Sequence, residues 1–292
     1  MGYRRREMWF PRAIEMWEYY DANYGAPGIE RRKRRKATPE EIRKHNQYNK
    51  ERTCRWKMRE HFRENDLYLT LTFKPENRPE NMAEAAKIWS KTCDKLRAHY
   101  KKNDVPFQWI RNIEVGSRGA WHIHVVLKNC PGIIEALTKA WTTGTRKEKK
   151  SLGSVLIKPM DTEGEFAKLA AYMTKTPETD KRIVESSYST SRNLPVPEPK
   201  ERKYERWKSF DGKDPRMIPK GWYVDPSSFV EGITRAGYPF RRFQLLPLDG
   251  KRRQRPARTK LIGAEKIKDI ESPNAMFDTE EKGDKAERDE GS

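Results

Sequence analysis

The sequence predicts an α+β fold in which helices pack on an antiparallel β-sheet. Between residues 67 and 176, segments with alternating apolar residues are interleaved with segments whose apolar residues recur every three or four positions. The first pattern is typical of strands and the second of helices. Their order is β-α-β-β-α-β-α, with a hairpin at the second and third strands. We expect four regions: a basic, aromatic N-terminal arm at 1–60, the core domain at 61–185, a basic, aromatic extension at 186–263, and an acidic, disordered tail at 264–292.

The first strand and the first helix of the core have clear boundaries in the sequence. Alternate residues of 67–73 are apolar, and Pro75 ends the run. Asn81 is followed three residues later by Glu84, as in a capping box, so a helix is expected to begin here. Apolar residues then recur at helical spacing as far as Tyr100, which predicts one buried helix face.

The later elements follow from the same patterns. Strands are expected at 108–115 and 121–128, joined by a turn at 116–119 that contains two glycines. Three further elements complete the core: a helix at 132–141, a strand at 155–157 that ends before Pro159, and a helix that opens at the capping box Thr162-Glu163-Gly164-Glu165 and ends before Pro177.

The charge balance favours a nucleic-acid partner. The 292 residues include 62 Lys+Arg against 43 Asp+Glu, a formal net charge of +19. Such a surplus attracts a polyanion. Two basic clusters are expected to contact DNA phosphates, although a like-charge block is also typical of a solvated arm. They comprise Arg31, Arg32, Lys33, Arg34, Arg35 and Lys36 in the first cluster and Lys251, Arg252 and Arg253 in the second, and Arg118 in the hairpin turn is expected to contribute as well.

Several functional classes find no support in the sequence. No apolar stretch approaches the roughly 20 residues that span a bilayer, so no membrane partner is expected. The basic N-terminus lacks the apolar region of a signal peptide, and the three cysteines lack metal-ligand spacing, which favours reduced thiols in a cytoplasmic protein. No glycine-rich phosphate loop indicates an attached helicase or ATPase, so a separate host helicase is an expected partner.

Two histidines lie two residues apart in the strand expected at 121–128. Because strand side chains alternate faces, His122 and His124 point the same way and are able to hold one divalent metal. Glu114 lies eight residues before His122 and approaches the same face across the hairpin. This His-His-Glu set suits Mn²⁺ somewhat better than Mg²⁺, although Mg²⁺ is the commoner nucleic-acid cofactor. The alternative is two ordinary exposed or hydrogen-bonded histidines and an exposed glutamate.

Tyr172 and Lys175 lie three residues apart in the last helix and therefore share a face. A free phenol has a pKa of about 10, so a tyrosine nucleophile needs positive charge nearby. Lys175 supplies that charge one turn away, and Lys168 does so less directly, with DNA contact as its other expected role. Alternatively, Tyr172 is a half-buried aromatic residue and Lys175 a charge at the helix C-terminus. A tyrosine nucleophile beside a lysine, together with a pair of metal-binding histidines, indicates chemistry on a phosphodiester.

Three short segments of this sequence, which contain the residues discussed above, resemble the motifs of the HUH-type rolling-circle replication initiators and follow one another in the same order. The resemblance is greatest to single-tyrosine members of the filamentous-phage gene II type and of small bacterial phages and plasmids. It covers about 66–200 and rests on Leu69-Thr70-Leu71-Thr72, on Glu114 with His122-Ile123-His124, and on Tyr172-Met173-Thr174-Lys175, with weaker likeness at Trp141 to Gly144 and at Ser191 to Pro195.

The resemblance implies a fold, a mechanism and a partner. The fold would be a five-stranded antiparallel sheet flanked by helices, although the sequence pattern locates only four strands. Tyr172 would attack DNA and leave a 5′-phosphotyrosine, Lys175 would assist, and Glu114, His122 and His124 would hold Mn²⁺ or Mg²⁺. The activity would be site-specific cleavage and transfer of single-stranded DNA at a replication origin, starting rolling-circle replication. Resealing would need a second protomer or another tyrosine such as Tyr188.

Two other classes of function stay open. A single-tyrosine transposase or relaxase would use the same residues on different DNA ends. A non-catalytic basic DNA-binding protein would bind DNA regardless of metal and of the Tyr172 hydroxyl.

Overall fold

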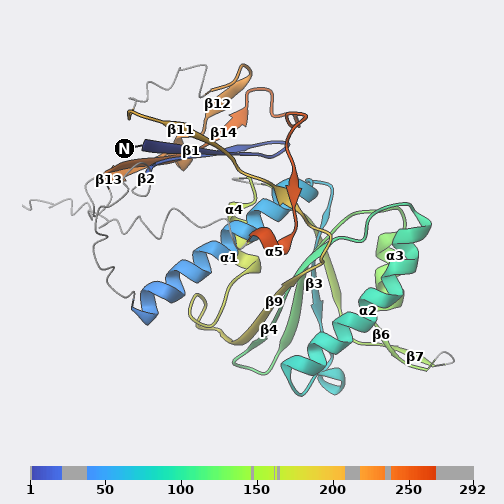
Figure 1. Cartoon of the computed structure of the whole chain (residues 1–292). Helices are drawn as coiled ribbons and strands as arrows, with labels where there is room; N and C mark the ends of the chain where they lie inside the picture. Colours follow the sequence, from blue (N-terminus) through green and yellow to red (C-terminus); the bar gives the residue numbers. More distant parts are fainter. Residues whose placement is uncertain are drawn as a thin grey trace, which may run out of the picture.

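The computed structural model describes residues 2–21, 38–145, 148–160, 162, 165–207, 218–233 and 238–267. The basic cluster at 31–36 and the acidic tail beyond 267 lie outside these residues, so the predictions for them stay predictions. Figure 1 shows four layers: one sheet, a layer that holds helices α1 and α4, a second sheet, and helices α2 and α3. No helix within the described ranges has the length and apolar character needed to cross a membrane.

The core domain is built on a five-stranded sheet with strand order β8-β3-β5-β4-β9, in which every neighbouring pair is antiparallel. The predicted α+β class and the five-stranded sheet implied by the resemblance are confirmed. The strands are β3 (Leu67–Thr72), β4 (Trp109–Gly116), β5 (Trp121–Leu127), β8 (Val155–Pro159) and β9 (Ile183–Thr190).

Strand β9 is the one that the sequence pattern did not reveal. Most of its side chains are polar, so it lacks the apolar alternation that marks the other strands. It forms the edge of the sheet beside β4 and crosses the expected domain boundary at residue 185.

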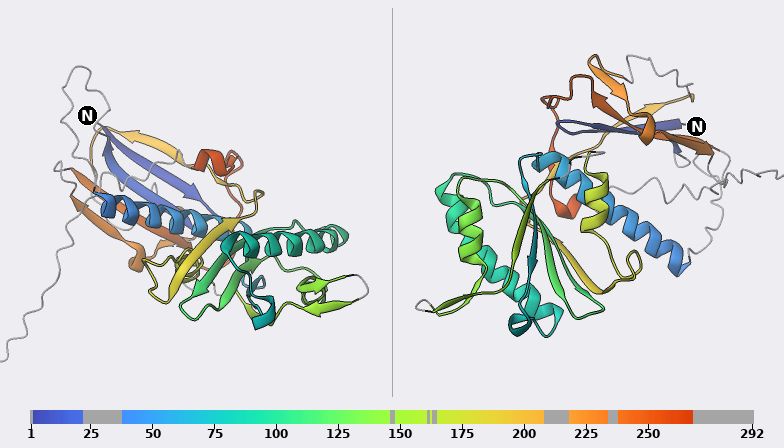
Figure 2. Two further views of the ribbon diagram at one scale, coloured as in Figure 1. Left: turned by 90° about the horizontal axis from the view of Figure 1, so that it is seen from below. Right: turned by 180° about the vertical axis from the view of Figure 1, so that it is seen from behind.

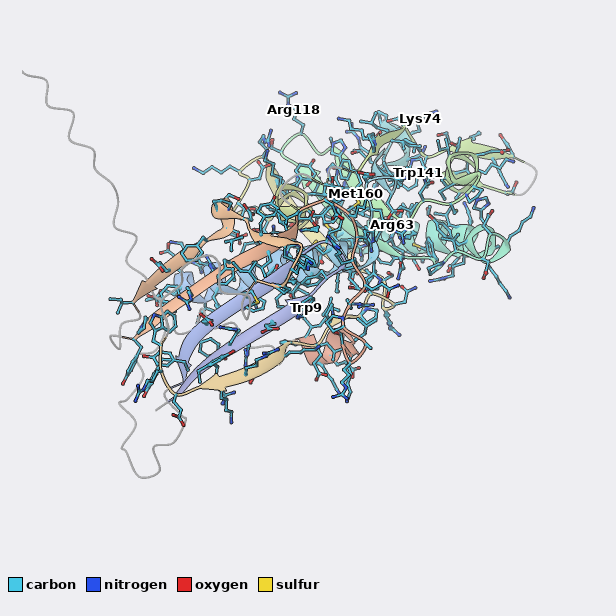
Figure 3. The ribbon with its side chains drawn as sticks, turned by 90° about the horizontal axis from the view of Figure 1, so that it is seen from above. Trp9, Arg63, Lys74, Arg118, Trp141 and Met160 are labelled. Carbon is cyan, nitrogen blue, oxygen red and sulfur yellow. The ribbon has the colours of Figure 1, made fainter. Side chains whose placement is uncertain are left out.

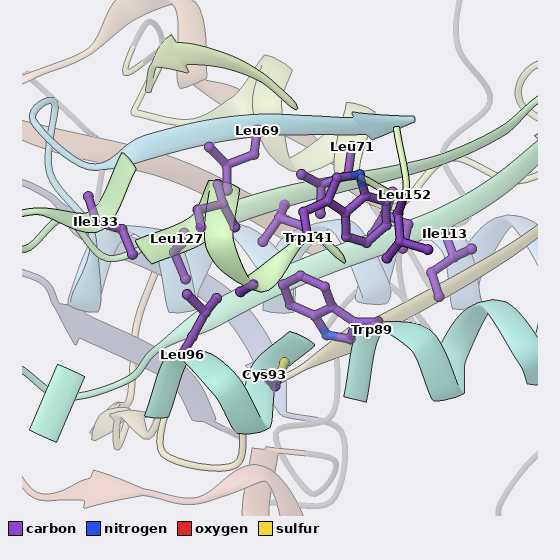
Figure 4. Close-up of a cluster of buried hydrophobic side chains, with 14 of the residues drawn as sticks. Leu69, Leu71, Trp89, Cys93, Leu96, Ile113, Leu127, Ile133, Trp141 and Leu152 are labelled. Atoms are coloured by element: carbon purple, nitrogen blue, oxygen red, sulfur yellow. The ribbon is translucent and has the colours of Figure 1, made fainter. Parts of the chain in front are cut away.

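One face of this sheet is covered by α2 (Met82–Lys102) and α3 (Ile133–Ala140), as Figure 2 shows from two sides. Asn81 caps α2 as predicted, because its side chain accepts a hydrogen bond from the Glu84 amide at 3.0 Å. Figure 4 shows how Trp89 and Leu96 of α2 pack against Leu71 and Leu127 of the sheet. The polar residues near the middle of the sheet, such as His124 and Glu114, lie on the opposite face.

The opposite face carries α1 (Pro39–His61) and α4 (Ala167–Met173). Met58 of α1 and Met173 of α4 are fully buried there, in an apolar cluster with Val126 of β5. Helix α4 begins at Ala167 and not at the predicted capping box; Glu163 lies outside the described part of the chain. The two residues before it, Glu165 and Phe166, have φ of 52° and 67°, a left-handed conformation that helix residues do not adopt.

Parts of the expected arm and extension form a second sheet, for which the sequence analysis located no strands. Its order is β11-β1-β2-β14-β12, with β13 also paired to β14. These strands are β1 (Gly2–Trp9), β2 (Ile14–Asp21), β11 (Lys200–Tyr204), β12 (Trp222–Val224), β13 (Val230–Ile233) and β14 (Pro239–Pro247).

Buried ion pairs explain why this sheet escaped prediction. Glu18 of β2 accepts from Arg5 of β1 at 2.6 Å and from Arg241 of β14 at 2.5 Å, and all three side chains are buried. Charged residues that neutralise one another in this way occupy positions where a sequence pattern leads one to expect solvent.

The remaining elements are short. They are β6 (Thr142–Gly144), β7 (Lys149–Ser151), β10 (Val196–Pro197), β15 (Leu261–Ile262), α5 (Ala264–Ile267) and the 3₁₀ helices η1 (Pro75–Asn77) and η2 (Pro226–Ser228). Strand β6 pairs with β7 and β10 pairs with β15.

Candidate active site

The centre of the polar face of the first sheet is built by strand register. Glu114 of β4 lies opposite His122 of β5, and Thr72 of β3 is the partner of the same histidine on its other side. His124 lies in the same way between Asn112 and Thr70. Because alternate side chains share a face, these residues point toward the layer of α1 and α4. The prediction that Glu114 reaches the face of the histidine pair is therefore confirmed.

Helix α4 brings Tyr172 over this face. The Tyr172 hydroxyl lies 3.3 Å from His124 Nε2, and the two rings meet edge to face with centroids 5.1 Å apart. Tyr172 is 39% exposed, so part of the residue lies at the surface of the protein. The Lys175 ammonium lies 4.1 Å from the centre of the Tyr172 ring. The predicted tyrosine and lysine thus lie together with the predicted histidine.

Glu114 is the charged centre of the cluster. Its carboxylate accepts a hydrogen bond from His124 Nε2 at 2.9 Å. It also forms an ion pair with Lys175, whose Nζ lies 3.1 Å from Oε1 and 2.9 Å from Oε2. Burial raises the pKa of this carboxyl, but the contacts with His124 and Lys175 outweigh burial and lower the pKa below its ordinary value. Glu114 is therefore ionised at neutral pH.

Tyr68 is a member of the site that the sequence analysis did not include. Its hydroxyl lies 2.8 Å from His124 Nδ1, and Thr70 Oγ1 lies 3.2 Å from the same nitrogen. Because Nε2 faces the Glu114 carboxylate, His124 donates there and accepts from Tyr68 at Nδ1. Burial, followed by the neighbouring Tyr172, raises the pKa of the Tyr68 phenol. Tyr68 belongs to the polar set of β3, and that alternation was the signal that pointed to it.

The end of α4 is held by contacts from three directions. The Lys175 carbonyl accepts from Ser186 Oγ of β9 at 3.1 Å and from Asn112 Nδ2 of β4 at 3.5 Å. Gln47 of α1 donates to the Thr174 carbonyl at 3.2 Å. These bonds fix the backbone of the Tyr172 to Lys175 turn relative to the sheet.

The donor atoms present fit a divalent ion in their chemistry. An imidazole nitrogen and a carboxylate oxygen are ligands of such ions, but His124 Nε2 donates to Glu114 Oε1 here, so an ion would have to replace this proton. The pKa of His122 is lowered, first by burial and then by His124, which keeps the imidazole neutral as a ligand must be. Asn112 Oδ1 on the same face is buried without a hydrogen-bond partner, a further oxygen donor.

This arrangement is not a closed metal cage. The described residues contain no group of three His, Cys, Asp or Glu side chains placed to hold an ion together. The His122 and His124 ring centres are 6.2 Å apart, and Lys175 already neutralises Glu114. The metal prediction for Glu114, His122 and His124 stays a prediction.

The expected DNA-contacting residues lie at separate places on the surface. Arg118 is exposed in the β4–β5 turn, as Figure 3 shows, and Lys168 is exposed on α4. Lys251 and Arg252 are exposed, and Arg253 forms an ion pair with Asp249 at 3.1 Å. Their roles in DNA binding stay predictions.

A comparison with known families bears on the same residues. Residues 66–177 match the family model described as replication-associated protein ORF2/G2P. The matched segment contains Glu114, His122, His124, Tyr172 and Lys175, and it confirms the resemblance seen in the motifs. It indicates a role in DNA replication and hence interaction with DNA. Neither a curated protein nor a solved structure matches the chain.

Proposed function

We propose that this protein is a nicking and strand-transfer enzyme that starts rolling-circle replication at a single-stranded origin. Tyr172 is the nucleophile, Lys175 assists it, and Glu114, His122 and His124 hold Mn²⁺ or Mg²⁺. A separate helicase of the host would open the duplex. This proposal gives a specific reaction to the replication role that the family match indicates.

The observation that carries the proposal is the placement of the Tyr172 hydroxyl. It lies 3.3 Å from His124, on a residue that is partly exposed and whose ring lies 4.1 Å from the Lys175 ammonium. A fixed cation at this distance stabilises negative charge that develops in the transition state. A tyrosine at the protein surface with a fixed cation beside it suits the role of a nucleophile.

The reaction is a transesterification. The Tyr172 oxygen forms a bond to the phosphorus of the scissile phosphodiester while the bond from phosphorus to the 3′ oxygen breaks. The phenol proton leaves to solvent, and the 3′ oxygen takes up a proton to become a free hydroxyl. The DNA 5′ phosphate remains on Tyr172, and attack by another 3′ hydroxyl reverses the step. A bound divalent ion would neutralise charge on the non-bridging phosphate oxygens.

The cluster around Glu114 suits this chemistry because its parts are already oriented. In the structure Tyr68 contacts one nitrogen of His124 and Glu114 contacts the other, which orients the imidazole; a bound ion would replace the Nε2 proton between His124 and Glu114. Lys175 is fixed by ionic contact with Glu114 and by the bonds to its backbone. Preorganised charge of this kind is the usual source of transition-state stabilisation.

The test is cleavage of a single-stranded oligonucleotide that carries the native origin, with Mn²⁺ or Mg²⁺. Wild-type protein should form a covalent adduct, and Tyr172→Phe should lose it while still binding the DNA. The matched control is Tyr223→Phe in the second sheet, because Tyr223 is 42% exposed, close to the value for Tyr172. Equal cleavage by wild type and Tyr172→Phe would exclude this nucleophile. DNA binding without cleavage under all metals would favour the non-catalytic interpretation.

A further inference from the structure

We propose that a cavity between α1, α4 and the second sheet binds a nucleotide of the single DNA strand, apart from the Tyr172 site. The identity of this ligand as DNA rests on the proposed function. The cavity measures about 290 Å³, the lower end of the range for ligand pockets, so its size suits one nucleotide and excludes a duplex. Its principal lining residues are Trp17, Tyr48, Arg52, Arg55, Ser227 and Arg242.

Tyr48 of α1 lies between two of the arginines. The guanidinium of Arg52 lies 5.6 Å from the Tyr48 ring centre and that of Arg242 lies 5.5 Å from it. Arg242 also donates to the Tyr48 hydroxyl at 2.7 Å. Guanidinium groups bind phosphate through a planar fork, and aromatic rings stack on bases. The wall of the cavity therefore carries both groups that recognise a nucleotide.

The arginines of the wall outnumber its carboxylates. Glu15 is occupied by Arg59 and by the Trp56 indole, which donates to it at 2.7 Å. Glu51 accepts from Gln47 at 2.7 Å. Three arginines thus face the cavity, while one of its two carboxylates is already neutralised by an arginine outside the lining. An anionic ligand is favoured over a neutral or cationic one.

The position of the cavity connects it with the tyrosine helix. Ala167 and Ala170 of α4 form part of its wall, two to five residues before Tyr172. Tyr48 and Glu51 also line a second, wider hollow of about 770 Å³ that reaches Thr176 and Thr179, directly after Lys175. The two hollows adjoin at Tyr48 and Glu51, so one strand that occupies both would run along α1 from the residues after Lys175 to the arginine cavity. Two adjoining hollows favour a segment of DNA over a free nucleotide.

The test is binding of a fluorescein-labelled single-stranded oligodeoxythymidylate of about 20 nucleotides to the full chain, followed by anisotropy at several salt concentrations. All proteins carry Tyr172→Phe, so binding is scored without cleavage. Arg242→Gln should weaken binding about tenfold and lower the salt slope by about one. Arg242→Lys should recover part of the loss. The matched control is Arg97→Gln, an exposed arginine on α2 that is ion-paired with Asp94, and it should change the affinity less than twofold.

A steric variant separates the cavity from a general charge effect. Ser227→Phe adds bulk at the cavity wall without altering charge, and it should also weaken binding about tenfold. Thermal melting first checks that Arg242→Gln and Ser227→Phe are folded. If both folded variants bind the oligonucleotide as tightly as Arg97→Gln does, the cavity does not bind the strand. If deoxythymidine monophosphate displaces the oligonucleotide when the two are at the same concentration, the cavity binds a free nucleotide and the inference is also overturned.

These results are independent of the proposed reaction. A wild-type adduct with no effect of Arg242→Gln or Ser227→Phe would overturn the cavity alone. Weakened binding in both variants without any wild-type adduct would overturn the proposed nicking alone and leave the cavity as a strand-binding site.

Discussion

The Lys175 ammonium contacts both carboxylate oxygens of Glu114, at 3.1 Å and 2.9 Å, across 61 residues of sequence. The same ammonium lies over the Tyr172 ring. One lysine therefore links the buried carboxylate to the exposed phenol.

Lys175→Met should lower the rate of nicking by about 10²–10³-fold, the usual effect of removing one oriented charge from a transition state. The affinity for single-stranded DNA should change much less, because Lys175 is only one of many basic residues. Single-turnover cleavage and anisotropy measure the two quantities. Lys139→Met on α3 removes an exposed lysine of the same type, paired with Glu135, and should leave the nicking rate unaltered. Comparable rates for the two variants would remove Lys175 from the mechanism.

Glu114→Gln should weaken Mn²⁺ binding by about tenfold or more, because the substitution removes the only carboxylate of the proposed ligand set. Electron paramagnetic resonance of free Mn²⁺ measures this binding without reference to activity. In parallel, EDTA should stop nicking by the wild type, and added Mn²⁺ or Mg²⁺ should restore it. Glu135→Gln on the exposed face of α3 is the charge-matched control. Unchanged Mn²⁺ binding in Glu114→Gln would contradict the ligand assignment.

Gly153→Ala should destabilise the fold and disturb the site. A Cβ at this position would lie 1.9 Å from the Thr72 carbonyl oxygen, next to the strand end that pairs with His122. The flanking bonds, Thr72 amide to Ser154 carbonyl at 3.0 Å and Lys74 amide to Leu152 carbonyl at 2.9 Å, would have to shift. We expect a loss of about 1–3 kcal/mol in the free energy of unfolding, as for other overpacked sites.

Urea unfolding of Gly153→Ala and Gly263→Ala measures this effect. A Cβ at Gly263 meets no atom within 4 Å, so this control should stay within about 0.5 kcal/mol of wild type. The same stability for both variants would show that the chain around Thr72 relaxes without cost.

Protonation of His61 should lower the free energy of unfolding at pH values below the ordinary histidine pKa. His61 Nε2 lies 2.6 Å from the Pro195 carbonyl, so it donates there, and Nδ1 accepts from Gln108 at 3.1 Å. Burial lowers the pKa of His61 below its ordinary value of 6.5. The unfolded chain therefore takes up this proton at a higher pH than the folded chain, and stability is lost as the pH falls through and below about 6.5.

The measurement is the free energy of unfolding of wild type and His61→Gln between pH 8 and pH 5. The variant cannot protonate at this position, so its stability should fall less steeply with decreasing pH. A pH dependence as steep as that of wild type would show that His61 does not contribute to it.

The sequence predicted the elements that carry strong patterns. The apolar alternation of β3 and β5 and the helical spacing of α2 set those boundaries correctly, since one face of each is buried in the same core. The register that brings Glu114 to His122 followed from the hairpin. The polar strand β9 and the second sheet were missed, because β9 is mostly polar and the second sheet buries charged residues such as Arg5 and Glu18 beside its apolar ones. Neither shows a plain apolar alternation in the sequence.

The same limit applied to the site. The alternation in β3 puts Tyr68 on the face opposite its apolar residues, but the contact of Tyr68 with His124 depends on side-chain packing that spacing does not encode. The arginine cavity joins α1, α4 and β14, which are up to about 200 residues apart in the chain. Only the tertiary structure brings such residues together.

The central claim is that Tyr172 carries the DNA after cleavage. The most direct test is mass spectrometry of the protease-digested adduct formed between wild-type protein and an origin oligonucleotide. We predict a nucleotide joined through its 5′ phosphate to the peptide that contains Tyr172. An adduct on Tyr68 or Tyr188, or cleaved DNA with no adduct, would contradict the account.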